Sequence, residues 1–108
     1  MANTYKVLGQ QAPSATTNTT LYTVPSATSA VCSTLVVCNR ETGTTFRVAV
    51  RPGGATISSE HYLTYDTAIE GFDTIFLTMG ITLATTDVVT VYSTSGNVSF
   101  SLFGSELT

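Results

Sequence analysis

The chain has one place where acid–base chemistry has candidate groups, because its only histidine, His61, stands next to Glu60 and near Asp66 in the sequence. A serine-type triad needs a histidine beside a nucleophile and a carboxylate, and the serine of many such enzymes lies in a Gly-x-Ser-x-Gly turn. No serine of this chain has that context. A small hydrolase using His61 and Asp66 is therefore the weakest function class, and we predict that the protein is not an enzyme.

Other residues that often carry chemistry have simpler structural interpretations. Asp66, Asp73 and Asp87 would have to approach one another to cleave a glycoside, whereas aspartates at strand ends and turns are typically solvated or form Asx turns. The lone histidine and the absence of a close ligand pair argue against a metal site. Gly53 and Gly54 lack the following lysine and helix of a phosphate-binding loop. The sequence thus predicts no catalytic residue, no metal and no cofactor.

Arginines form the only cation cluster in a chain of which 10% is charged. Arg47 and Arg51 are four residues apart on the outward face of a predicted strand, and Arg40 precedes them. They are predicted either to make bidentate contacts with carboxylates of a neighbouring subunit or to form an ordinary solvated face. With four cations and a net charge of -3, the chain lacks the many basic contacts that bind a phosphate backbone, so nucleic acid is not an expected partner.

Both cysteines lie in one predicted strand, residues 30–39. Six positions along a strand separate them by about 20 Å, so Cys32 and Cys38 cannot form a disulfide with each other. They are predicted to be small buried apolar residues on one face, or else one of them bonds to a cysteine of another chain. The five tyrosines are expected mostly in the core or an interface, since a chain without Trp does not indicate a carbohydrate site.

The same strand is predicted to be apolar on both faces, with Val31, Leu35 and Val37 on one and Cys32, Val36 and Cys38 on the other. Either a loop or terminal arm covers the second face, or that face belongs to a subunit contact. The candidate subunit interface therefore comprises Arg47, Arg51, Cys32, Val36 and Cys38.

These residues must be positioned by β-strands, because nearly a third of the 108 residues are Thr or Ser and apolar residues alternate in short runs. We predict one all-β domain over residues 1–108, an antiparallel β-sandwich of jelly-roll or immunoglobulin-like kind, with a polar loop or arm near residues 10–19. Sequence order leaves the topology open. The expected strands, about eight in number, are 4–9, 20–24, 30–39, 44–51, 61–69, 73–79 with a continuation through 81 and 83, 87–92 and 98–103.

Four segments together resemble a group of short tailed-bacteriophage proteins: 6–10 (KVLGQ), 21–25 (LYTVP) with 31–40 (VCSTLVVCNR), 46–52 (FRVAVRP) and 98–104 (VSFSLFG). Members of this group look like small virion structural proteins, so the resemblance implies an external or junctional part of a virion. The quoted segments are β patterns and turns without a catalytic signature. No functional residue is carried over from the group.

Low charge and abundant Thr and Val fit that implication, because such a surface loses little on being buried against other subunits. We expect a capsid decoration (cement) protein that stabilises the head, bound to other virion proteins and to copies of itself as a symmetric oligomer such as a trimer. The alternative is a neck, baseplate or tail-fibre component. A different class is a host-attachment module that binds cell-surface glycan through residues 52–60 and 93–97. The expected location is the virion, after synthesis in the host cytoplasm, with no membrane partner because no apolar run approaches the roughly 20 residues of a span.

Overall fold

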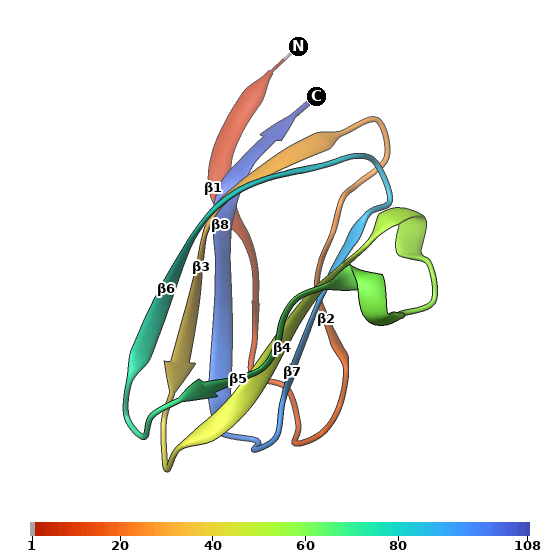
Figure 1. Cartoon of the computed structure of the whole chain (residues 1–108). Coiled ribbons are helices and arrows are strands. Elements are labelled where there is room, and N and C mark those ends of the chain that lie inside the picture. The colour runs from red at the N-terminus through yellow and green to blue at the C-terminus, as the bar shows by residue number, and fades with distance from the viewer. Residues whose placement is uncertain (1) are drawn as a thin grey trace.

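The computed structural model describes residues 2–108 apart from the side chain of Met79, and its regular structure is almost entirely β (Figure 1). The all-β prediction with about eight strands is confirmed. The connection after β4 contains two 3-10 turns, η1 (Pro52–Gly54) and η2 (Ser59–His61), and neither is a candidate for a membrane-spanning helix. The strands are β1 (Asn3–Gln11), β2 (Thr19–Thr23), β3 (Ser29–Asn39), β4 (Thr44–Arg51), β5 (Tyr62–Ile69), β6 (Thr74–Leu83), β7 (Val88–Ser93) and β8 (Val98–Leu107).

The strands form two four-stranded sheets, with the orders β1-β8-β3-β6 and β2-β7-β4-β5, and every pairing is antiparallel. The pairs β4–β5, β3–β6, β2–β7 and β1–β8 are nested, as if one long hairpin with its tip between β4 and β5 had been rolled up. This nesting is the jelly-roll arrangement, so the jelly roll is the correct one of the two predicted sandwich types.

The core lies between the sheets and consists of side chains at alternate strand positions. β8 contributes Val98, Phe100 and Leu102, all fully buried. Phe46 of β4 meets Phe100 edge to face, with ring centroids 6.1 Å apart, and this contact joins the two layers. The described residues leave no buried side-chain nitrogen or oxygen atom without a hydrogen-bond partner.

A bulge in β3 changes which side chains face the core. Against β8, Ser33 is an extra residue, because Cys32 pairs with Gly104 and Thr34 with Phe103. Against β6, the register shifts at the same point, but the extra residue lies in β6 between Thr78 and Ile81. One extra residue moves the side chains on one side of it to the opposite face. Cys32 therefore lies in the core with Leu35, and the prediction that it shares a face with Val36 and Cys38 is wrong.

Glycine is required where β8 passes this bulge. A Cβ atom on Gly104 would lie 2.0 Å from the backbone oxygen of Val31. Gly9 of β1 is equally restricted, since its Cβ would lie 2.1 Å from the oxygen of Leu21. The two positions allow backbones to approach more closely than any larger residue permits.

The predicted polar segment near 10–19 is a loop that packs on its own domain. Its first residues belong to β1 and Thr19 begins β2. Between these strands, Pro13 is buried and the Thr16 N–H donates to the Ser93 oxygen over 2.8 Å. This contact places the middle of the segment against the end of β7.

Candidate functional site

His61, Glu60 and Asp66, the candidate groups for acid–base chemistry, do not form a triad. The His61 Nδ1 atom accepts the Ser58 N–H at 3.1 Å, and its Nε2 atom lies 3.9 Å from the Glu60 carboxylate. Asp66 follows five residues later on β5, a distance of about 16 Å along an extended strand, and its carboxylate binds Arg47. His61 thus closes the η2 turn.

The other aspartates form turns. The Asp73 carboxylate accepts the Thr74 N–H at 2.8 Å. Asp87 accepts the backbone N–H groups of Gly53 and Ala84 at 2.8 and 2.9 Å, and so ties the β4–β5 connection to the start of β7. Within residues 2–108, no three His, Cys, Asp or Glu side chains are grouped to hold a metal ion.

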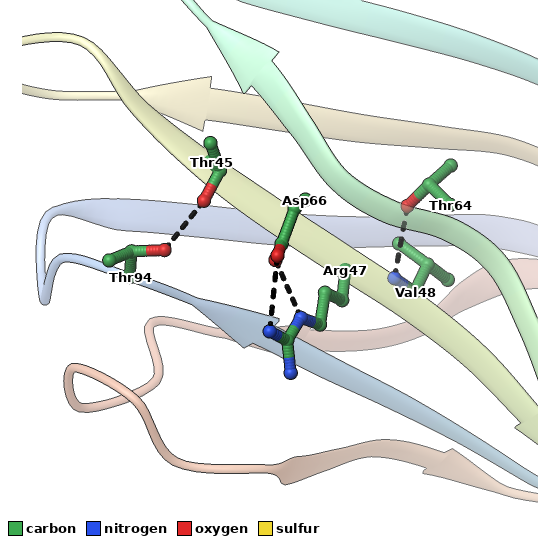
Figure 2. A network of polar contacts seen from close by, with 6 residues as sticks. All are labelled: Thr45, Arg47, Val48, Thr64, Asp66 and Thr94. Carbon is green, nitrogen blue, oxygen red and sulfur yellow. Dashed lines mark hydrogen bonds and ion pairs between the residues drawn. The ribbon is translucent and has the colours of Figure 1, made fainter. Parts of the chain in front are cut away.

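Arg47 is the centre of a polar and aromatic cluster on the outer face of the β2-β7-β4-β5 sheet. Its Nε and Nη2 atoms donate to the two carboxylate oxygens of Asp66 at 2.6 and 3.2 Å (Figure 2). The guanidinium carbon lies 4.1 Å from the ring centroid of Tyr65 and 4.2 Å from that of Tyr92. The predicted environment of Arg47 was a carboxylate of another subunit or solvent, whereas the observed partner, Asp66, belongs to the same chain.

A bulge in β5 explains why these groups meet. Phe46 pairs with Thr67 and Val48 pairs with Thr64, so Arg47 alone faces the two residues Tyr65 and Asp66. Asp66 has a φ of 51°, which turns the backbone and directs its carboxylate to the side of Arg47. Hydrogen bonding to Arg47 lowers the pKa of Asp66 and raises that of the arginine, so both stay charged.

The three arginines predicted to cluster are spread along the sheet. Arg51 donates to the Thr90 hydroxyl at 3.1 Å and to the Ala55 oxygen at 3.0 Å, which holds the β4–β5 connection against its own sheet. Arg40 donates to the Gly96 oxygen at 3.2 Å, at the other end of the sandwich. Arg47 is therefore the arginine held between aromatic rings.

The two loops predicted to bind glycan also lie at opposite ends. The β4–β5 connection contacts Asp87 before β7, while the β7–β8 turn contacts Thr45 at the start of β4 and Arg40, which precedes that strand (Figure 1). The eight residues of β4 between them span about 25 Å. Residues 52–60 and 93–97 consequently cannot form one small binding site.

A concavity of about 470 Å³ opens beside the Arg47 cluster and is lined by Ser58, Ser59, Tyr62 and Tyr65. The rings of Tyr62 and Tyr65 are nearly perpendicular, at 83°, with centroids 4.8 Å apart. The side chain of Tyr65 is 57% exposed, so this tyrosine is not one of those buried in the core. The only sequence signal for this arrangement is the closeness of Tyr62, Tyr65 and Asp66 on one strand.

The outer face of the β1-β8-β3-β6 sheet has a different character, because the described register places no Asp, Glu, Lys or Arg on it. Lys6 and Glu106 belong to these strands but lie on rows that face inward with Cys32. The outer face exposes Tyr5 (80%), Phe76 (68%) and Val7 (47%). Its three main rows are Tyr5–Ser105–Val31–Thr82, Val7–Phe103–Thr34–Thr78 and Gln10–Ser101–Val36–Phe76.

The candidate interface residues of β3 divide between the two faces of the sheet. Val36 and Cys38 are half-buried on the uncharged outer face. Cys32 is fully buried between the sheets, where burial raises the pKa of its thiol to about 11. A second subunit has no access to Cys32 in the folded domain.

Between the sheets near the chain termini, the Glu106 carboxylate joins two strands to β8. It accepts the Tyr22 hydroxyl at 2.5 Å and the Lys6 ammonium at 3.2 Å. The hydrogen bond from Tyr22 and the charge of Lys6 lower the pKa of Glu106. Burial and the same carboxylate raise the pKa of Tyr22 well above its usual range. The three groups form a satisfied structural contact.

No protein-family model matches the chain, and neither a curated protein nor a solved structure matches it. The resemblance to tailed-phage proteins stays a prediction based on the sequence segments alone.

Proposed function

We propose that this protein is a bacteriophage virion structural protein, an external capsid decoration protein that stabilises the head. The observation that carries the proposal is the uncharged outer face of the β1-β8-β3-β6 sheet. Its three main rows contain only apolar side chains, hydroxyls and one amide, and they include the exposed side chains of Tyr5, Val7 and Phe76.

Such a face is suited to burial against another protein. A charged side chain loses favourable hydration when it is buried without a partner, while a hydroxyl needs only one hydrogen bond to be satisfied. The centres of protein interfaces are accordingly depleted in charge and enriched in aromatic residues. Four strands support this face, so a partner would meet a rigid surface.

Two further considerations support the assignment to a virion. The jelly roll occurs in viral capsid proteins, although it also occurs in lectins and other classes, so the fold supports the proposal by analogy alone. The sequence segments that resemble tailed-phage proteins include parts of β1, β3 and β8, which form the uncharged face. Copies of the chain are proposed to assemble as a symmetric oligomer, such as a trimer, on the particle.

A neck, baseplate or tail-fibre component is the alternative, and the same face would serve it. The two roles differ in copy number. Quantitative mass spectrometry of purified particles, from the phage whose genome encodes the chain, is expected to give a copy number comparable with that of the major capsid protein. A small copy number would overturn the decoration role in favour of the alternative, and absence from the particle would overturn both.

A binding experiment tests the face itself. Phe76→Lys places a charge at an exposed aromatic position of the proposed contact, on the edge strand β6, while Thr23→Lys adds the same charge to the edge strand β2 of the other sheet. Binding of the purified protein to capsids lacking it is expected to weaken at least about tenfold for Phe76→Lys, because a buried unpaired charge is costly. Thr23→Lys should bind like the unchanged protein. Equal binding by both variants would refute the assignment of this face.

A further inference from the structure

We propose that the concavity bounded by Tyr62, Tyr65, Ser58 and Ser59 is a binding site for a neutral saccharide. This inference goes beyond the structural role, because the site lies with the β2-β7-β4-β5 sheet and the uncharged contact face belongs to the other sheet. Both faces are therefore accessible at once on an assembled particle that buries only one of them.

The lining combines the two kinds of contact that a sugar ring requires. The faces of a pyranose carry C–H groups that pack on aromatic rings, while its edge carries hydroxyls that need hydrogen-bond partners. Tyr62 and Tyr65 supply two nearly perpendicular aromatic walls, and Ser58 and Ser59 supply hydroxyls beside them. The volume of about 470 Å³ is within the range of sites for small ligands.

The walls of the site are held in place by contacts outside it. Arg47 stacks on Tyr65 and is itself fixed by Asp66 and Tyr92. On the opposite side, two hydrogen bonds close the turn that carries the serines. The Ser58 backbone N–H donates to Nδ1 of His61, and the Ser58 backbone oxygen accepts the His61 backbone N–H at 3.1 Å. A site ordered before binding loses less conformational entropy when its ligand binds.

The charges around the site select a neutral ligand. The nearest guanidinium, that of Arg47, is already paired with both oxygens of Asp66. Glu60, in the same turn as Ser59, has a side chain that is 76% exposed and would repel an acidic sugar. Its pKa is lowered by hydrogen bonds from its own backbone and from Ser58, so it is charged at neutral pH. A saccharide without carboxylate, sulfate or phosphate groups fits these charges.

The experiment uses the labelled 108-residue chain on an array of neutral and acidic glycans, followed by titration calorimetry with the best neutral ligand. Tyr65→Ala is expected to weaken binding at least about tenfold, the equivalent of one lost aromatic contact. Ser59→Trp, which fills the concavity from an exposed position, should abolish binding. Tyr5→Ala removes an exposed tyrosine from the uncharged face and should bind normally.

Circular dichroism and thermal unfolding check that each variant is folded, and Ser59→Trp keeps the test valid if Tyr65→Ala is unstable. Binding of no neutral glycan, a preference for acidic glycans, or unchanged binding by folded Ser59→Trp would each overturn the proposal. These results leave the capsid role intact, because that role is measured by copy number and by Phe76→Lys. Failure of the saccharide proposal would therefore not count against the capsid role, and failure of the capsid role would not count against the saccharide site.

Discussion

Replacing Arg47 by methionine tests whether the stacked arginine stabilises the edge of its sheet. The substitution keeps the length and most of the apolar stem but removes the guanidinium that contacts Tyr65 and Tyr92. A cation–π contact at an exposed site contributes about 0.5–1 kcal/mol, so the free energy of unfolding should fall by about 1–2 kcal/mol. The ion pair with Asp66 adds less, because that carboxylate is 45% exposed.

Urea unfolding followed by circular dichroism measures this loss, and thermal unfolding should show a fall in Tm of about 4–8 °C for each kcal/mol. Arg40→Met is the matched control. It removes an exposed guanidinium that donates one hydrogen bond, to the backbone oxygen of Gly96. It should change the free energy of unfolding by less than about 0.5 kcal/mol. Arg47→Lys keeps the charge but loses the planar guanidinium fork. We expect its free energy of unfolding to be nearer to that of Arg47→Met than to that of the unchanged protein.

A double-mutant cycle separates stacking from general effects of the substitution. Arg47→Met, Tyr92→Leu and the double variant should give a coupling energy of about 0.5–1 kcal/mol. A coupling near zero, or an equal loss of stability in Arg40→Met, would refute the conclusion that stacking on the tyrosines stabilises this part of the sheet.

Three other predictions concern the interior. Gly104→Ala should lower the free energy of unfolding by at least about 3 kcal/mol because its Cβ meets a backbone oxygen, whereas Gly80→Ala, with open space around its Cβ, should be neutral or slightly stabilising in the same urea titration. The lowered pKa of Glu106 means that its stabilisation is complete above its ordinary value of 4.5 and is lost as the pH falls through the folded pKa. The stability of Glu106→Gln should therefore decrease less between pH 6 and pH 3 than that of the unchanged protein, and an equal decrease would show that the contact is not linked to folding. Iodoacetamide at pH 8 should modify Cys38 before Cys32, whose thiol is buried with a raised pKa, and mass spectrometry finding Cys32 modified first would contradict the position of the bulge.

The strands could be predicted closely because alternation along a strand is a local signal. The expected strand at 44–51 has the observed bounds of β4, and that at 30–39 differs from β3 by one residue. The choice of a jelly roll could not be predicted, because the pair β1–β8 joins residues about a hundred positions apart. Nothing within either strand identifies so distant a partner.

The candidate sites were harder to predict because bulges decide them. One extra residue, Ser33, moves Cys32 into the core, and the bulge in β5 brings Asp66 to Arg47. Bulges depend on the register with neighbouring strands, which the local pattern does not contain. The uncharged face could not be identified for the same reason, since it joins side chains from four strands, including Tyr5 and Phe76.

A reconstruction of the assembled particle, at a resolution that shows side chains, tests the central claim most directly. We predict that Tyr5, Val7 and Phe76 are covered by a neighbouring chain and that the Arg47 face of the other sheet remains open. Density in which the β1-β8-β3-β6 sheet faces solvent, while neighbouring chains contact the domain elsewhere, would contradict the claim that its uncharged outer face is the assembly surface.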